Sequence, residues 1–321
     1  MSDIGIVGAG SFGTALAISL ASENKNVTLW ARSQSQVEEM IKFNENKKFL
    51  PGIKFPNTLL PIVDFKDLNS CKVILIAIPT QSLSKLFSSH TIETNTVPIV
   101  ACCKGAELET GDLPTEIIKR YLPENEILVL TGPGFATELA LGKPTAMTLG
   151  SELPKNNIQK ALSSKTLRLY QSNDLIGLQL GGALKNVIAI ACGMVMGAGL
   201  GESARASLMT RGFAEMIRFA KEKGANPNTL MGLSGFGDLS LTCNSTKSRN
   251  FSYGFSLTSE TGLKISDTVE GIKTSHIIAK QARSVGVEMP ITQMVSQVLK
   301  NELSTKQAIE QLLSRPLKDE I

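Results

Sequence analysis

The chain has 321 residues, of which 42% are hydrophobic and 19% are charged. This composition fits a globular protein of one large or two ordinary domains, and it excludes a disordered or fibrous chain. The formal net charge of +4 is small and the basic residues are scattered, so we expect no nucleic-acid partner.

The first half of the chain alternates short apolar runs with helical patterns. Continuous apolar runs predict strands at residues 4–7, 27–30, 73–78, 98–101, 127–130 and 146–149. Helical patterns follow the first two strands at residues 11–22 and 33–43. The stretch that comes next is expected to be a loop, because it contains Pro51, Gly52, Pro56 and Pro61. Such strands separated by helices indicate an α/β domain of Rossmann type, with a doubly wound parallel sheet covered on both faces.

The second half changes character at about residue 173, where strand patterns nearly vanish. A long helix is expected to begin near Asp174, whose side chain can cap it. Gly224 and Gly286 stand where helix C-termini need a left-handed residue. The other predicted helices cover residues 204–223, 269–285, 291–300 and 304–313. We therefore predict a Rossmann domain over residues 1–173, followed by an all-helical domain over residues 174–321.

Targeting and metal-binding signals are weak. Residues 1–7 contain no basic segment before the apolar run, so they are expected to form a strand and not a signal peptide. The apolar stretch 187–200 is shorter than a membrane span, which needs about 18 residues, so we expect a buried core helix. Without export or membrane signals, we expect a cytoplasmic protein that is not attached to a membrane. Five cysteines without a CxxC spacing, beside only two histidines, predict reduced, mostly buried thiols and no metal site.

A glycine-rich turn follows the first predicted strand. Residues 8–13 read GAGSFG, which matches GxGxxG between a strand and a helix. Gly8 permits the tight turn, Gly10 lets the backbone approach a pyrophosphate, and Gly13 lets the helix pack close to the strand. The helix N-terminus offers free N–H groups to phosphates. The motif therefore predicts dinucleotide binding, with a glycine-rich turn of no function as the alternative.

The end of the second strand bears on the choice of dinucleotide. NAD-selective sites often carry Asp or Glu there, whereas this chain has Arg32. A guanidinium can pair with the 2′-phosphate of NADPH and stack on adenine. We therefore favour NADPH, with NADH as the alternative cofactor, unless Arg32 is only a solvated surface residue.

Further short blocks, taken together and in order, make the chain resemble the bacterial-type NAD(P)-dependent glycerol-3-phosphate dehydrogenases. The blocks are GAGSFGTALA (8–17), KG (104–105), GPGFA (132–136), LGGALKNV (180–187), GFGDL (235–239), TC (242–243), SRN (248–250) and VEG (269–271). The resemblance implies a Rossmann domain with a helical substrate domain. It also implies reduction of dihydroxyacetone phosphate to sn-glycerol 3-phosphate, which feeds phospholipid synthesis.

Ketone reduction needs a group that protonates the carbonyl oxygen and groups that hold the substrate. Lys185 is the candidate acid, since it lies in an apolar, glycine-rich helical stretch where burial would lower its pKa. On the residues alone a lysine that reaches the surface is equally expected. The catalytic lysine of the family falls on Lys185, which favours the catalytic role.

Two polar segments are candidates for holding the substrate. Asp238 follows a turn of glycines and could bond a substrate hydroxyl or orient Lys185, or it could cap the helix at residues 239–243. Arg249, between Ser248 and Asn250, could grip a phosphate, although a polar surface turn is the simpler interpretation of these three residues.

The resemblance assigns further contacts. It implies substrate phosphate recognition at residues 248–250, with Arg249 also near the cofactor, and contacts of Lys104 with both ligands. For the cofactor it adds Glu270. We also expect Gly132 and Gly134 to contact the substrate and Ser11, Phe12 and Ala136 to contact the cofactor, with Asn186 and Thr242 as candidate second contacts. Gly134 departs from the small hydroxyl or branched residue usual in the family, so any substrate contact there must come from the backbone.

Two other functions are open on the sequence. A 3-hydroxyacid or 6-phosphogluconate-type dehydrogenase shares the two-domain plan and a catalytic lysine. A non-catalytic dinucleotide sensor would need the GxGxxG turn but not Lys185, Asp238 and Arg249 together. The blocks between residues 235 and 250 favour the glycerol phosphate enzyme. We expect a small-molecule substrate and a homodimer.

Overall fold

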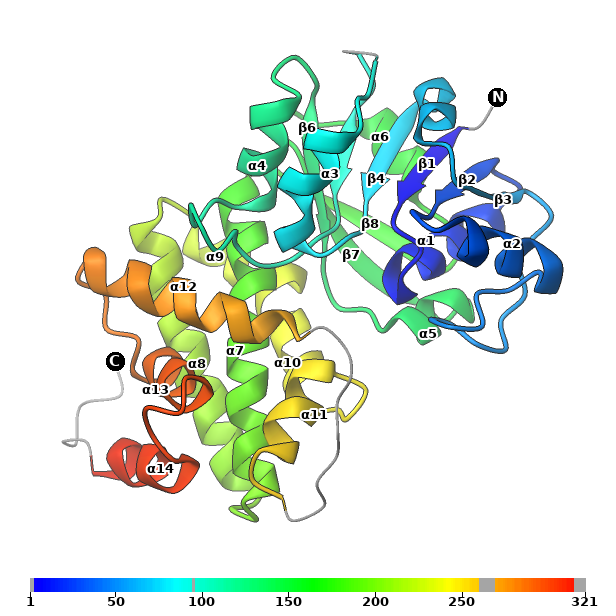
Figure 1. Cartoon of the computed structure of the whole chain (residues 1–321). Coiled ribbons are helices and arrows are strands. Elements are labelled where there is room, and N and C mark those ends of the chain that lie inside the picture. Colours follow the sequence, from blue (N-terminus) through cyan, green and yellow to red (C-terminus); the bar gives the residue numbers. More distant parts are fainter. Residues whose placement is uncertain (1–2, 94–95, 260–268, 315–321) are drawn as a thin grey trace.

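The computed structural model describes residues 3–93, 96–259 and 269–314, so parts of the predicted second domain, residues 260–268 and 315–321, lie outside the described residues. An eight-stranded sheet has the order β3-β2-β1-β4-β5-β6-β7-β8 (Figure 1). Neighbouring strands are parallel except β6 and β7, which run antiparallel. The strands are β1 (Ile4–Val7), β2 (Val27–Trp30), β3 (Leu59–Ile62), β4 (Val73–Ile76), β5 (Ile99–Ala101), β6 (Ile127–Thr131), β7 (Thr145–Gly150) and β8 (Leu167–Ser172).

Helices cover both faces of the sheet, as predicted. Successive strand residues point to opposite faces, so Leu75 of β4 packs in one core cluster while Ile74 and Ile76 pack in another. The first cluster lies under α1 (Ser11–Ala21), α2 (Gln34–Phe43), α5 (Ala136–Ala140) and α6 (Asn156–Leu162). The second lies under α3 (Leu83–Ser89) and α4 (Pro114–Tyr121). Short 3-10 turns occupy Phe65–Ser70 and Thr80–Ser82.

Both edge strands of the sheet correct the sequence prediction. The segment expected to be a loop contains β3, in which Pro61 is tolerated because an edge strand can do without one ladder hydrogen bond. β8 was not predicted, since only alternate residues of this other edge are apolar and buried. β4 ends at Ile76, two residues earlier than its apolar run suggests.

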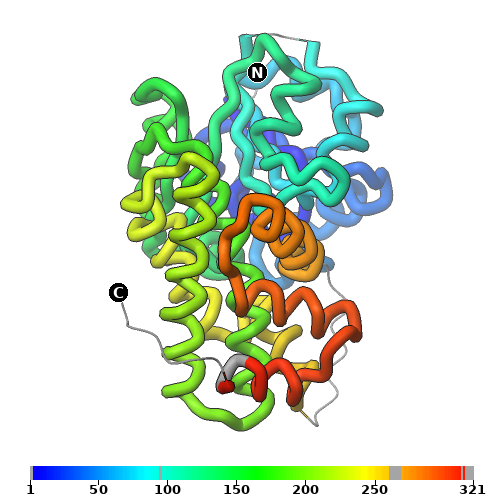
Figure 2. Tube along the Cα trace, turned by 90° about the vertical axis from the view of Figure 1, so that its left-hand side faces the viewer, coloured from blue at the N-terminus to red at the C-terminus, as the bar shows by residue number. Residues whose placement is uncertain are grey.

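The second half is helical and is built around α7 (Leu175–Gly197). Asp174 caps α7 as predicted, because its carboxylate accepts the N–H of Gly177 at 2.8 Å. α7 is long and apolar enough to cross a membrane, but 89% of its most apolar window is buried inside the protein, so it is a core helix. It runs between neighbouring helices (Figures 1 and 2). They are α8 (Glu202–Glu222), α9 (Pro227–Leu230), the π-helical turn η3 (Leu233–Gly237), α10 (Asp238–Cys243), α11 (Arg249–Ser256), α12 (Glu270–Ser284), α13 (Pro290–Leu299) and α14 (Thr305–Leu313).

Left-handed glycines end two of these helices where the sequence predicted them. Gly224 has φ +81° and Gly286 has φ +70°. The predicted starts also hold within a residue or two for α12, α13 and α14, and Ser304 caps the last of them.

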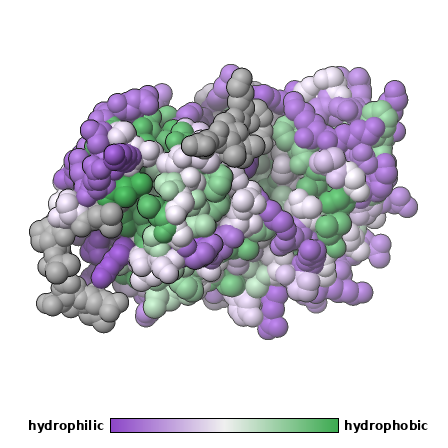
Figure 3. Space-filling model, turned by 90° about the horizontal axis from the view of Figure 1, so that it is seen from below, coloured by the Kyte–Doolittle hydropathy of each residue, from purple (hydrophilic) through white to green (hydrophobic). Residues whose placement is uncertain are grey.

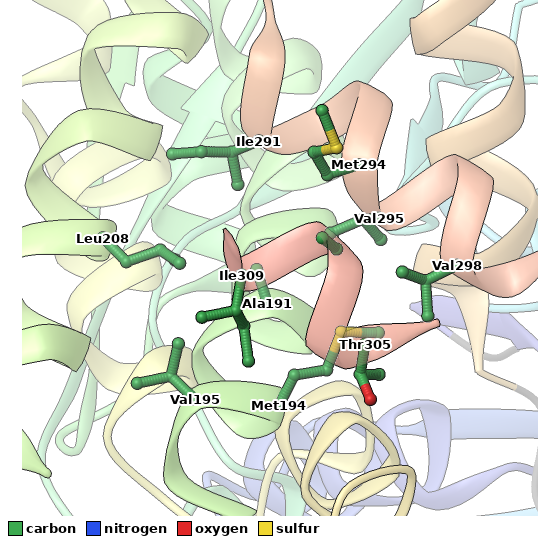
Figure 4. A pocket seen from close by; sticks show the side chains of 11 residues that line it. Ala191, Met194, Val195, Leu208, Ile291, Met294, Val295, Val298, Thr305 and Ile309 are labelled. Atoms are coloured by element: carbon green, nitrogen blue, oxygen red, sulfur yellow. The ribbon is translucent and has the colours of Figure 1, made fainter. Parts of the chain in front are cut away.

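A small apolar pocket lies between α7, α8, α13 and α14 (Figure 4). Its volume is about 30 Å³, and side chains such as Met194, Leu208, Met294 and Val298 line it. Seen from below, green apolar surface appears among purple hydrophilic side chains (Figure 3). A pocket of this size and polarity does not suit a phosphorylated substrate, and none of the predicted site residues lines it.

Glycines bring α11 into direct backbone contact with α7. A Cβ on Gly254 would overlap the carbonyl of Ile190, and a Cβ on Gly193 would overlap the carbonyl of Phe251. This close approach fixes the position of α11, whose first turn carries Arg249 and Asn250.

Gly254→Ala should therefore lower the free energy of unfolding by roughly 1–3 kcal/mol, because the added methyl group forces α11 away from α7. Chemical denaturation followed by circular dichroism measures this loss. Ser256→Ala on the same helix adds no volume and serves as the control. An unchanged transition for Gly254→Ala would contradict the close contact.

Candidate active site

The parallel strands β4 and β5 end on the same side of the sheet, and this side meets α7. We call it the carboxyl edge, as distinct from the edge strands β3 and β8. Lys104 follows β5, and its aliphatic chain runs beside Gly182, where a Cβ would lie 3.5 Å from the Lys104 Cγ. Ligands bind at this edge in open α/β sheets. The edge therefore brings a lysine of the sheet next to the predicted catalytic helix.

One buried carboxylate links two lysines at this edge. Asp238 accepts a hydrogen bond from Lys185 Nζ at Oδ1 (2.9 Å) and one from Lys104 Nζ at Oδ2 (2.6 Å). Lys185 also donates to Thr242 Oγ1 at 2.7 Å. The side chains of Lys185 and Asp238 are 8% and 3% exposed, so the lysine is buried and does not reach the surface.

Burial and neighbouring charges set the protonation of this cluster. Burial lowers the pKa of Lys185 to about 8, against the attraction of Asp238. Burial would raise the pKa of Asp238, but the cations of Lys104 and Lys185 hold that pKa below its ordinary value. The result is an amine that can gain and lose a proton near neutral pH beside a carboxylate that stays charged.

The helix-capping interpretation of Asp238 is wrong. Asp238 is the first residue of α10, the N-cap is Gly237, and no side chain caps this helix. The turn before it is π-helical, and Gly235 is pressed against the backbone of Leu230, so the turn is packed and not flexible. The carboxylate accepts hydrogen bonds from the two lysines instead.

The three polar residues of the SRN block differ in their contacts. Ser248 is buried and caps α11 by accepting the N–H of Phe251 at 3.2 Å. Asn250 accepts the N–H of Gly271 at 3.0 Å through its side-chain oxygen, which joins α11 to the start of α12. Arg249 is exposed, and its charge acts on Glu270 at the N-terminus of α12. Burial raises the pKa of Glu270, and Arg249, Lys104 and Lys185 oppose that rise.

The GPGFA block contacts the lysine cluster through Lys104. Lys104 Nζ donates to the carbonyl of Gly132 at 3.4 Å. Gly132 has φ +146°, and a Cβ there would lie 2.9 Å from the Met147 Cα. A Cβ on Gly134 would meet only Thr145 Cγ2, at 3.3 Å. Ala136 begins α5.

The glycine-rich turn has the shape that a dinucleotide needs. Gly8 has φ +112°, and a Cβ on Gly13 would overlap the Gly8 carbonyl, whereas a Cβ on Gly10 would meet nothing within 4 Å. The open space at Gly10 lies at the start of α1, which no side chain caps. The turn therefore fits a pyrophosphate, which could accept hydrogen bonds from the first N–H groups of α1.

Hydrogen bonds of side chains within and outside the motif also support this turn. The carbonyl of Ala9 accepts hydrogen bonds from Gln36 Nε2 (3.0 Å) and Asn46 Nδ2 (2.9 Å), and Ser11 Oγ donates to the carbonyl of Phe49 at 2.8 Å. Gln36 and Asn46 are not predictable from the sequence, because only the fold brings them to the turn. Phe12 is half-buried against the core, and Arg32 is exposed just after β2.

Comparisons with known proteins match both halves of the chain to the same family. A sequence model of the NAD-dependent glycerol-3-phosphate dehydrogenase N-terminus matches residues 3–157, and one of the C-terminus matches residues 174–310. The chain belongs to the NAD-dependent glycerol-3-phosphate dehydrogenase family.

Relatives and solved structures extend this match. Proteins named glycerol-3-phosphate dehydrogenase (NAD(P)+) from Ruegeria sp. (strain TM1040) and Paracoccus denitrificans are 48% and 44% identical, each covering 99% of both chains. The crystal structure of glycerol-3-phosphate dehydrogenase from Coxiella burnetii is 34% identical, with a TM-score of 0.89 over 98% of this chain and 99% of that chain. These findings confirm three predictions. They are the family resemblance, the fold class of a Rossmann domain followed by a helical domain, and the activity of an NAD(P)-dependent dehydrogenase. The family match favours the glycerol phosphate enzyme over the two alternatives.

Asp238→Asn should move the titration of Lys185 in this dehydrogenase to below pH 8, since the neutral amide no longer favours the ammonium form. NMR of labelled lysine side chains across pH measures the shift. Asp3→Asn, which removes a carboxylate paired with Lys72 on the surface, is the control and should leave Lys185 unchanged. A Lys185 titration that stays in place in Asp238→Asn would show that the two groups do not interact.

Proposed function

We propose that the protein reduces dihydroxyacetone phosphate to sn-glycerol 3-phosphate with NADPH, with NADH as the alternative cofactor. The observation that carries this proposal is the buried Lys185 amine, held by Asp238 and Thr242 next to the ammonium group of Lys104. The names of the relatives support the substrate and the cofactor.

Lys185 acts as the general acid. Its ammonium group donates a proton to the ketone oxygen while negative charge develops there, and the amine is left neutral. In the reverse direction the neutral amine takes the proton of the glycerol hydroxyl. Asp238 and Thr242 hold the amine in one position, because each accepts a hydrogen bond from it.

The substrate is held by the residues around this amine. Arg249 is exposed and presents paired N–H donors suited to the phosphate. Lys104 and Asp238 contact the rest of the three-carbon chain, and the backbone of Gly132 and Gly134 closes the site. Ser248 and Asn250 complete the phosphate contacts. Their side-chain oxygens bind backbone N–H groups, which leaves the Ser248 hydroxyl hydrogen and the Asn250 amide NH₂ as donors.

The turn at residues 8–13 would hold the cofactor. The bound reduced nicotinamide supplies the hydride. The open space at Gly10 and the N-terminus of α1 receive the pyrophosphate, with Gly8, Ser11, Phe12 and Gly13 shaping the turn. Arg32 would bind the 2′-phosphate, and Lys104, Ala136, Arg249 and Glu270 would be further cofactor contacts.

We assign the two domains the roles that the sequence predicts. Residues 1–173 form the NAD(P)-binding Rossmann domain, and residues 174–321 form the helical substrate and catalytic domain, from which Arg249 and Glu270 would also contact the cofactor. We place the enzyme in the cytoplasm, as a homodimer that supplies glycerol phosphate for phospholipid synthesis. Its partners are small molecules, without nucleic acid, membrane or a metal.

The deciding experiment follows nicotinamide absorbance with dihydroxyacetone phosphate and each reduced cofactor, in both directions and across pH. Because the pKa of Lys185 is about 8, reduction should fall as pH rises through 8, where the acid loses its proton. Oxidation of glycerol 3-phosphate needs the neutral amine, so it should rise over the same range.

Lys185→Ala should lower kcat by roughly 10²- to 10⁴-fold without loss of fold. Lys25→Ala is the matched control, because burial also lowers the pKa of Lys25, which is half-buried and lies away from the site. Near-normal turnover by folded Lys185→Ala would refute the assignment, and no turnover of this ketone by the parent would refute the proposed reaction.

Arg32→Ala should raise the KM for NADPH more than the KM for NADH, since only NADPH carries the 2′-phosphate. Steady-state kinetics with each cofactor check this difference. Equal effects on both constants would make Arg32 a solvated surface residue.

A further inference from the structure

Lys104 is fixed at its backbone by a side chain of another loop. The hydroxyl of Thr80, which is 2% exposed, donates to the Lys104 carbonyl at 2.8 Å. Thr80 follows β4 and Lys104 follows β5, so this hydrogen bond joins two neighbouring loops at the carboxyl edge of the sheet. Lys104 is thus held at its backbone by Thr80 and at its amine by Asp238.

The residues that follow Lys104 are hydrogen-bonded to the turn at Thr80–Ser82 and to helices α3 and α4. Gln81 Nε2 donates to the Ala106 carbonyl at 2.6 Å, and Gln81 Oε1 accepts the Leu108 N–H at 3.0 Å. The Glu107 carboxylate accepts hydrogen bonds from Ser84 and Arg120. These hydrogen bonds lie beyond Lys104 in the chain, whereas that of Thr80 is made to the backbone of Lys104 itself.

The backbone next to Lys104 has little room to adjust. Gly105 has φ +111°, and a Cβ there would lie 3.2 Å from the Thr274 hydroxyl of α12 and 3.8 Å from the Thr80 hydroxyl. The loop is therefore enclosed between Thr80 and α12. A change at Thr80 would be passed to the Lys104 side chain, because the chain beyond it is already anchored.

We propose that Thr80 is a positioning residue whose hydroxyl holds the backbone of Lys104, so that the Lys104 ammonium group stays on Asp238 and beside Lys185. Thr80 acts through Lys104 and not by contact with the reacting atoms. The effect of Thr80 on catalysis rests on the proposed function. The effect of Thr80 on the position of Lys104 does not, because it is present in the ligand-free protein.

Displacement of Lys104 would change the pKa of Lys185. The charged and titratable groups that act on Lys185 are Asp238 of α10, Lys104, Glu270 of α12 and Cys243, whose raised pKa keeps its thiol neutral. The Lys104 cation lowers the pKa of Lys185. Without Thr80 to hold Lys104, that cation moves off Asp238, and the pKa of Lys185 rises toward its ordinary value.

The test compares Thr80→Val, which keeps the side-chain shape without the hydroxyl, with Thr80→Ser, which keeps the hydroxyl. Thr58→Val is the matched control, because the Thr58 hydroxyl also donates to a backbone carbonyl, that of Ala21 at 2.9 Å, away from the site. For Thr80→Val we expect kcat/KM for dihydroxyacetone phosphate to fall about 10- to 100-fold. Thr80→Ser and Thr58→Val should stay within about threefold of the parent.

NMR of labelled lysine side chains in the ligand-free protein supplies a readout that needs no substrate. The Lys185 titration should move to higher pH in Thr80→Val and stay in place in Thr80→Ser and Thr58→Val. An unmoved Lys185 titration in folded Thr80→Val would overturn the positioning role, whatever the substrate is. A parent that does not reduce this ketone would refute the proposed reaction, and the shifted titration would still support the role of Thr80.

Discussion

The carboxylate of Asp238, buried between two lysine amines, is the interaction on which the site depends. Its two oxygens bind Lys185 at 2.9 Å and Lys104 at 2.6 Å. A buried carboxylate without partners would take up a proton, and two buried ammonium groups without an anion would repel each other. The three groups come from α10, α7 and the loop after β5, so the cluster forms only when the helical part packs on the carboxyl edge of the sheet.

Glycines of α7 make this packing close enough. A Cβ on Gly181 would lie 2.6 Å from the Ser234 carbonyl, so the turn before Asp238 rests on the bare backbone of α7. Gly182 gives the Lys104 side chain its path along the same helix. Glycine inside a helix costs about 1 kcal/mol relative to alanine, and burial of nearly the whole of α7 offsets that cost. The LGGALKNV block thus combines the amine with the two glycines that bring its partners to it.

Much of the architecture follows from local patterns in the sequence. The inner strands, the glycine-rich turn, the Asp174 cap and the helical second half are encoded by apolar runs, spacing and capping residues. The edge strands β3 and β8 are not, because an edge strand accepts proline and polar residues and its pairing is decided by its neighbour. In the site, the burial of Lys185 was an open choice, since an apolar helix can bury a lysine or let it reach the surface. The contacts of Thr80, Gln36 and Asn46 join segments far apart in the chain, which no local pattern reports.

The balance of charge connects the cluster to an anionic substrate. Lys104, Lys185 and Arg249 face Asp238 and Glu270, so the site carries more positive than negative groups. Burial disfavours the ammonium form of Lys185, which is the form that ketone reduction requires. In the proposed reaction the phosphate beside Arg249 adds negative charge near that amine and favours its protonation. Binding of a group remote from the reacting carbon would then help to keep the acid charged until the proton is transferred.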